Sequence, residues 1–428
     1  MKKSLLGLIM SSVAILSLSA CGVGGGNSQQ KSESSSDNDE IKGEIVFATN
    51  QTNIVDTKLK DLAQDYMDDH PGTNIRIEGL KDYDQTLQTR IAGGQAPDIF
   101  YRIDSISNDT AQDYFLPLDD LGFNEDQITT YENAASPDGK VYTIADSIDY
   151  TGIVYNKKAF EAAGIKEVPQ TIEALMKASE QLKEKGITPM GTAYKDKWPL
   201  YPWIDFDVVA TVMTGDPLNG KATLSEKDDV INENEVVSAD ILRDMNLKGY
   251  LESDVMSANW DQLKLDLSQA KMAMVYLPSW FPAQLVELGA KEDDIGMFPF
   301  PETKGILVST NKVWGASKES KSPALAKDFL KYLIEDGRYA TACLATPSWK
   351  NQAGNQPFMK ELLSYDVPVI EPGKQDPRVD KFTALQNESE MDEQTFLQNY
   401  IIEKDDVKAQ KLIDDVNKKW TASREKLK

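Results

Sequence analysis

The first part of the chain alternates short apolar runs with amphipathic stretches, which predicts alternating strands and helices. Residues 45–48, Ile-Val-Phe-Ala, form a continuous apolar run, typical of a parallel strand buried on both faces. Apolar residues recur at helical spacing over 59–67. Short strands are predicted at 75–77 and 98–101, and a helix that ends at Gly93 lies between them. This β-α-β-α-β order predicts a doubly wound α/β fold.

The same alternation continues through the middle of the chain. Strands are predicted at 142–144 and 153–155, and helices at 157–163 and 171–185. Each of these helices is followed by a glycine, Gly164 or Gly186, the residue that best adopts the left-handed conformation at a helix end.

Helices are also predicted in the C-terminal third of the chain. A helix is expected from Ser322 to Glu335, with Ser322 as its cap and Pro323 at its first position. The last forty residues show only a thin apolar seam, which predicts largely solvated helices; the seam comprises Val407, Leu412, Val416 and Trp420.

The composition excludes several classes of protein. The 69 acidic residues outnumber the 46 basic ones and give a net charge of −23, which disfavours nucleic acid as a partner. His70 is the single histidine, so Ser-His-Asp catalysis and multi-histidine metal sites are disfavoured, and we expect neither a metal nor a cofactor. The length of 428 residues exceeds one ordinary core and predicts two lobes.

The N-terminus has the features of an export signal. Two lysines precede a mainly apolar stretch over 5–18, which is shorter than a membrane-spanning helix. Leu18-Ser19-Ala20-Cys21 then resembles the bacterial lipoprotein box, which implies cleavage after residue 20 and a lipid on Cys21. Residues 22–43 have almost no large apolar side chains and are predicted to form a flexible tether. Cys343 is left unpaired and is expected to be a small buried hydrophobe.

Sequence patterns for catalysis are weak. Gly215 to Lys221 fits the glycine and lysine spacing of a P-loop, but Ala222 replaces the hydroxyl residue that holds Mg²⁺, and Pro217 removes a backbone donor. The many acids leave open a carbohydrate-active enzyme that uses an acid pair.

Aromatic residues beside proline, glycine and serine are the more informative signal. Indole and phenol faces suit the apolar faces of pyranose rings, while carboxylates and amides bind sugar hydroxyl groups. The predicted aromatic positions are Tyr201, Trp203, Trp280, Trp314 and Trp349, with Trp198 as an alternative to the first two. The predicted polar positions are Asn50, Gln51, Arg102, Asp104 and Asp149.

Several segments resemble, in order, the extracellular solute-binding protein family 1. Gly94-Gln95-Ala96-Pro97-Asp98-Ile99 is similar to its Gly-x-x-Pro-Asp-Ile segment, and Tyr155-Asn156-Lys157-Lys158-Ala159-Phe160 to its Tyr-Asn-Lys-x-x-Phe signature. Ala270-Lys271-Met272-Ala273-Met274 through Trp280 resembles a third segment, although Ala270 and Met272 depart from the usual glycine and alanine. The resemblance covers about residues 44–350.

The resemblance implies two α/β lobes with a ligand cleft between them, as in type II periplasmic binding proteins, and delivery of the ligand to an ABC importer. The lobes are expected at 44–148 plus 310–345 and at 149–309 plus 346–428. It implies that Asp149 is a cleft acid, that Trp280 stacks on a sugar, and that Asn50, Gln51, Arg102 and Asp104 lie in the cleft.

The expected protein is therefore a monomeric, non-enzymatic carbohydrate-binding lipoprotein on the outer face of the cytoplasmic membrane. Its partners would be the sugar and the permease subunits, with membrane contact only through the lipid. The same fold binding a non-sugar solute, such as a glycerophosphodiester, stays open. Arg102 is the one cation among the predicted site residues, which favours a neutral sugar.

Overall fold

The computed structural model describes residues 41–103, 105–352, 355–373 and 376–427. The predicted signal peptide, the lipid-bearing Cys21, nearly all of the predicted tether and the predicted site residue Asp104 lie outside these described residues. Gly43, placed at the end of the predicted tether, already begins the first strand.

The first sheet has five strands. β1 (Gly43–Thr49) runs parallel to both β2 (Thr73–Gly79) and β3 (Ile99–Tyr101), and β3 is the middle strand of the five. β10 (Val313–Ala316) lies antiparallel to β3 and to β4 (Ile144–Ala145). The strand order is β2-β1-β3-β10-β4, so a late strand is inserted beside the early parallel ones.

The second sheet is organised around one long strand, β5 (Ser147–Asn156), all ten residues of which are buried. β5 pairs antiparallel with four strands, β7, β8, β9 and β11, and the order through the sheet is β12-β9-β5-β7-β6. The bounds of these strands are β6 (Thr188–Gly191), β7 (Met272–Pro278), β8 (Ile295–Phe298), β9 (Ile306–Thr310), β11 (Thr346–Pro347) and β12 (Val369–Ile370).

The chain passes between the two sheets through very short segments. Asp146 alone joins β4 to β5, and Asn311 with Lys312 joins β9 to β10. These two crossings are bonded to each other, because the Asp146 N–H donates to the Lys312 carbonyl at 3.2 Å and the Asn311 N–H to the Ser147 carbonyl at 3.1 Å. Polar side chains at these crossings are therefore held in fixed positions.

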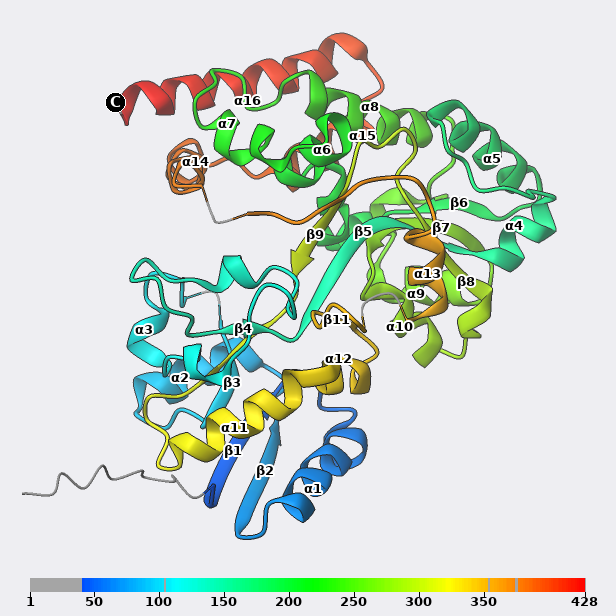
Figure 1. Ribbon diagram of the computed structural model, residues 1–428. Coiled ribbons are helices and arrows are strands. Elements are labelled where there is room, and N and C mark those ends of the chain that lie inside the picture. The colour runs from blue at the N-terminus through cyan, green and yellow to red at the C-terminus, as the bar shows by residue number, and fades with distance from the viewer. Residues whose placement is uncertain (1–40, 104, 353–354, 374–375, 428) are drawn as a thin grey trace, which may run out of the picture. The chain divides into compact units, whose positions relative to one another are not determined.

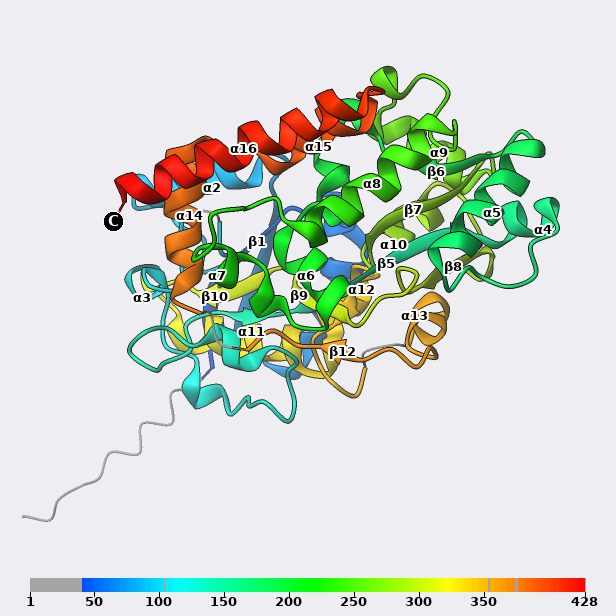
Figure 2. The ribbon, with the colours of Figure 1, turned by 90° about the horizontal axis from the view of Figure 1, so that it is seen from above.

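Each sheet has its own helices and apolar core. Figure 1 shows α11 lying beside β1 of the first sheet, and Figure 2 shows α16 crossing α14; α16 contacts both α14 and α15. The helices of the first core are α1 (Lys60–Asp69), α2 (Tyr83–Ala92), α3 (Ala111–Tyr114), α11 (Pro323–Ile334) and α12 (Arg338–Ala342). Those of the second sheet are α4 (Lys157–Ala163), α5 (Ile172–Glu184), α6 (Phe206–Thr214), α7 (Lys221–Leu224), α8 (Glu233–Leu247), α9 (Trp260–Ser268), α10 (Phe281–Glu287), α13 (Pro357–Leu362), α14 (Arg378–Ser389), α15 (Glu393–Ile402) and α16 (Asp406–Lys426).

Most of the predicted elements are present, and Gly164 and Gly186 have φ values of 75° and 72° as expected. Three details were wrong. The strand predicted at 142–144 is confined to β4, which begins only at Ile144. The Ser322 side chain does not cap α11, because its hydroxyl packs against the Gly43 backbone of β1. Val407 is 80% exposed and lies outside the apolar seam of α16.

Candidate functional site

A first cavity of about 520 Å³ is lined by residues from both sheets and from the crossings between them. Asn50 and Gln51, which directly follow β1, line it together with Trp280, which lies two residues beyond the end of β7 and directly before α10. Asp146 and Lys312 line it from the two crossings. Its wall therefore combines an indole, two amides and charges, a mixture that suits a small polar ligand.

Asp149 is a buried acid in the middle of β5, with 5% of its surface exposed. It lies between Ser147, which lines the first cavity, and Thr151, which lines a second cavity. The Ser279 hydroxyl donates to its carboxylate at 3.3 Å. Burial, with a smaller contribution from the nearby Asp146, raises the pKa of Asp149 to about 7, against the opposing effects of Ser279 and Lys312.

Asp146 and Lys312 were not among the residues predicted from the sequence. Asp146 is 3% exposed, and its carboxylate accepts a hydrogen bond from the Ser147 hydroxyl at 3.0 Å. Burial raises the pKa of Asp146, and the positive charge of Lys312 opposes this. The Lys312 ammonium lies 5.4 Å from the centre of the Tyr101 ring. The sequence offered only a weak signal for these two residues. Asp146 directly follows the apolar residues of β4, and Lys312 directly precedes those of β10.

Cys343 also lines the first cavity. It is a half-buried free thiol, and burial raises the pKa of this thiol to about 12, with the Asp146 charge adding to the effect. The thiol is therefore neutral at physiological pH and is not an activated nucleophile. Cys343 packs against the first apolar core, as expected, and it also forms part of the wall of the first cavity.

The second cavity has a volume of about 670 Å³, and two of the site residues predicted from the sequence line it. Arg102 and Tyr201 both line it, together with Asn108 and Thr151. The Arg102 guanidinium donates to the Asn108 side-chain oxygen, and burial lowers the pKa of Arg102. Burial raises the pKa of Tyr201, with Asp149 adding to the effect, so its phenol stays a neutral donor.

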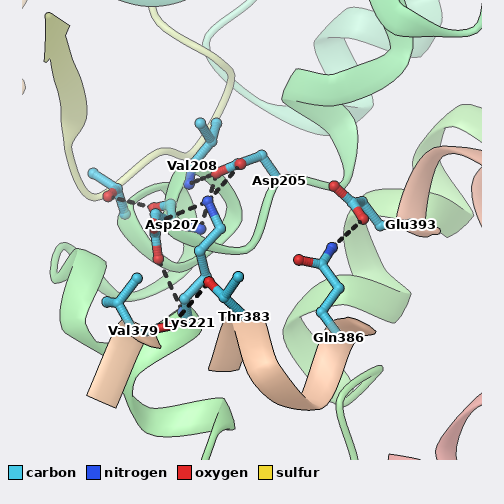
Figure 3. Close-up of polar contacts among 9 residues, drawn as sticks. Asp205, Asp207, Val208, Lys221, Val379, Thr383, Gln386 and Glu393 are labelled. Atoms are coloured by element: carbon cyan, nitrogen blue, oxygen red, sulfur yellow. Dashed lines mark hydrogen bonds and ion pairs between the residues drawn. The ribbon is translucent and has the colours of Figure 1, made fainter. Parts of the chain in front are cut away.

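The floor of the second cavity carries a compact charge cluster, shown in Figure 3. Lys221 lies 2.9 Å from an Asp205 oxygen and 3.2 Å from an Asp207 oxygen. Burial alone would raise the pKa of Asp205, but the Lys221 charge and its hydrogen bond outweigh burial and hold this pKa below its ordinary value.

This cluster explains the P-loop match in structural terms. The Lys221 ammonium is committed to two carboxylates, and its backbone N–H donates to Asp207 at 2.9 Å. A side chain at Gly220 would lie 2.5 Å from the Phe206 carbonyl oxygen, so this glycine serves close packing of α7 against α6. The glycine and the lysine that match the P-loop pattern thus serve local packing and a local ion cluster.

Trp280 belongs to a group of three tryptophans. Its ring centre lies 6.0 Å from those of both Trp198 and Trp260, and the Trp198 and Trp260 rings meet at 4.7 Å. Trp260, at the start of α9, was not predicted, because nothing in its local sequence connects it to Trp280. The tertiary fold alone brings these three rings together.

The structure corrects two of the predicted aromatic positions. Trp203 and Trp314 are each 1% exposed, so neither offers a ring face to a ligand. Trp203 packs against Tyr276 and Phe300, and Trp314 packs among the aromatic rings of the first core. Trp349 is half-buried and packs edge-on against Phe123.

The comparison with protein families gives one match that covers most of the chain. Residues 50–338 match the model of the bacterial extracellular solute-binding protein family. The chain belongs to this family. The resemblance inferred from the sequence is thereby confirmed.

Relatives of this solute-binding protein are distant in sequence. A multiple sugar-binding protein from Streptococcus mutans is 24% identical over 294 residues, which cover 66% of this chain and 69% of the relative. An ABC transporter extracellular-binding protein from Pyrococcus horikoshii is 22% identical and covers 78% of this chain and 76% of the relative.

Solved structures confirm the fold of this solute-binding protein. A binding protein of an ABC transporter from Bifidobacterium animalis subsp. lactis, in complex with mannobiose, has a TM-score of 0.74 at 24% identity and covers 90% of this chain and 95% of that one. The raffinose complex of a solute-binding protein has a TM-score of 0.66 at 19% identity, with coverage of 90% and 100%. The predicted two-sheet α/β class, like that of type II binding proteins, is therefore correct.

Two other features, a metal-binding group and a membrane-spanning helix, are not found among the described residues. Within the described ranges, no group of three or more His, Cys, Asp or Glu side chains is arranged to hold a metal ion. None of the helices in the described part of the chain combines the length and the apolar character needed to cross a bilayer.

Proposed function

We propose that this protein is the substrate-binding component of an ABC importer and that it binds an oligosaccharide along the two cavities on either side of Asp149. Relatives named for sugar binding, and a fold shared with sugar complexes, support this proposal. The ligand would be neutral, because Asp146, Glu287 and Lys312 give the first cavity charges of both signs, whereas an anionic group calls for clustered cations.

The observation that carries the proposal is the composition of the first cavity. The half-buried Trp280 supplies a flat apolar face, and Asn50 and Gln51, at the end of β1, line the same cavity. Pyranose rings combine apolar C–H faces with a rim of hydroxyl groups, so an indole beside amides suits both parts. The buried Asp149, with a pKa of about 7, can donate a hydrogen bond to a sugar hydroxyl in its acid form and accept a charge-assisted one in its ionised form.

Binding would proceed by closure around the ligand. The first and second sheets contribute opposite walls, and the crossings at Asp146 and at Asn311 with Lys312 are short enough to act as hinges. A sugar that contacts both walls favours the closed state by its extra contacts there. The permease would then recognise the closed form.

We further propose that the mature chain begins at Cys21, carries a lipid there and is held outside the cell as a monomer by the segment that precedes β1. The lipoprotein box at residues 18–21 supports this. Metabolic labelling with a radioactive fatty acid tests it: label should enter the wild-type protein and be absent from the Cys21→Ser variant.

A thermal-shift and calorimetry panel of mono- to tetrasaccharides tests the sugar proposal, since a ligand that binds only the folded state raises the melting temperature. For the sugar that binds, Trp280→Ala is expected to weaken binding by about 1–3 kcal/mol through loss of stacking. Trp280→Phe, which keeps a ring, should lose less. An unchanged dissociation constant in Trp280→Ala would exclude Trp280 from the site.

The pair of coupled buried acids, Asp146 and Asp149, also raises the possibility of glycoside hydrolysis, which uses two carboxyl groups with different pKa values. We expect binding without cleavage. Incubation of the protein with the bound sugar should give no new reducing ends over the level of the Asp149→Asn variant. Reducing ends that depend on Asp149 would show an enzyme instead.

A further inference from the structure

Trp198 differs from every other aromatic residue of this protein. The chain has 7 tryptophans, 16 tyrosines and 13 phenylalanines, and all of them fall within the described residues. Trp198, at 38%, is the one that is exposed, while the others are buried or half-buried. Trp198 is thus more exposed to water than any other aromatic side chain of the protein, against the usual preference for burying large apolar groups.

The backbone that presents Trp198 is held in an unfavourable conformation. Ala193 and Lys197, which bracket the short turn before Trp198, have φ values of 45° and 65°, although neither is a glycine. Non-glycine residues in this region are strained and persist only where surrounding contacts enforce them. Here Glu252 accepts hydrogen bonds from the backbone N–H groups of Thr192 and Ala193, at 2.7 and 3.0 Å, and Lys197 pairs with Asp392.

The Trp198 side chain is held in place by contacts with neighbouring aromatic rings. Trp260 meets it edge-on at 4.7 Å, and the Lys264 ammonium lies 5.4 Å from the centre of the Trp260 ring. Asp196, in the same turn, accepts a hydrogen bond from the Trp260 backbone N–H. The exposed indole is therefore a rigid surface and needs little ordering when something binds to it.

Trp198 lies next to a residue that lines the first cavity. Its ring centre lies 6.0 Å from that of Trp280, with 36° between the planes, and Trp280 lines that cavity. Two neighbouring indoles, mutually tilted by that angle, can each receive one of two successive rings of a twisted oligosaccharide.

We propose that Trp198 is an outer stacking position that binds a further sugar unit of the chain held at Trp280, and that it thereby makes the protein prefer longer oligosaccharides. This rests on the proposed function, because it requires that a sugar occupies the first cavity. Trp280 holds the inner unit, and Trp198 adds affinity only for a chain long enough to leave the cavity.

The test compares chain lengths by calorimetry with the full-length protein. The probes are mannobiose, mannotriose and mannotetraose, and in a second series melibiose, raffinose and stachyose. Trp198→Ala should weaken the longest sugar that binds by roughly tenfold, as expected for loss of one stacked ring. The shortest sugar that binds should change less than twofold. Trp198→Phe should restore most of the loss, and Leu247→Ala, at an exposed apolar residue of α8, should behave like the wild type.

The outcomes separate this inference from the function on which it rests. Sugar binding by the wild type with equal affinity loss at every chain length in Trp198→Ala would overturn the outer position, because Trp198 would then act only by supporting Trp280. Sugar binding without any loss would overturn it too, and both results leave the sugar-binding function intact. Failure of every sugar in both series to bind the wild type would overturn both proposals for these sugar classes.

Discussion

Replacing Lys221 with methionine is expected to lower the free energy of unfolding by about 2–4 kcal/mol, because it leaves two carboxylates in contact without their counter-charge. Asp205 and Asp207 both pair with Lys221, and their side chains keep only 24% and 31% exposure. The estimate lies somewhat below that for a fully buried pair, since the Lys221 side chain retains 26% exposure to water. Urea unfolding followed by circular dichroism measures the change.

Two companion variants separate charge from packing in this experiment. Lys248→Met removes an exposed ion pair with Asp244, whose atoms are 3.5 Å apart, and should change stability by less than about 0.5 kcal/mol. Adding Asp205→Asn and Asp207→Asn to Lys221→Met should recover part of the loss, because asparagine at position 205 can still cap α6. If the triple variant is less stable than Lys221→Met, uncompensated charge is not the cause.

The Asp149→Asn variant is expected to become more stable than the wild type as the pH rises from 5 to 7, by about 2–3 kcal/mol over that interval. The pKa of Asp149 is about 7 in the folded protein, raised mainly by burial from its ordinary value of 3.8. Between these values the folded wild type holds a proton that the unfolded chain has lost. The wild type therefore loses stability as the pH rises through this window, whereas asparagine has no proton to lose.

Denaturant unfolding of both proteins at several pH values gives this difference directly, because titrating groups that do not interact with Asp149 contribute equally to both proteins. Asp138→Asn is the matched control. The pKa of the exposed Asp138 is lowered, chiefly by a hydrogen bond from the Lys140 backbone, so Asp138 is ionised throughout the interval. A constant difference between wild type and Asp149→Asn from pH 5 to 7 would show that Asp149 is ionised when folded.

Local patterns in the sequence were sufficient for most of the fold. The apolar run at 45–48 and the glycine after α4 correspond to β1 and to a left-handed helix end, because burial on both faces and a positive φ leave clear local signals. The strand predicted at 142–144 failed for the opposite reason. Its residues are apolar and buried, but only the last of them has a strand partner.

The candidate site depended more on tertiary contacts. Trp203 and Trp280 both follow proline-containing segments, and only the packing of Tyr276 and Phe300 around Trp203 distinguishes them. Asp146 and Lys312 were missed because their place in the cavity follows from two crossings, 166 residues apart in the chain, that bond to each other. The order of family segments was the stronger guide to function, while the exact division of the chain into two lobes stays a prediction.

The unequal burial of the tryptophans gives the protein a built-in optical probe. Trp203, Trp314 and Trp420 are enclosed in cores and should emit at short wavelength, whatever happens in the cavities. The long-wavelength part of the emission should then come mainly from Trp198, the one exposed indole. Occupancy of the neighbouring cavity would therefore be readable as a change in emission colour, without any attached dye.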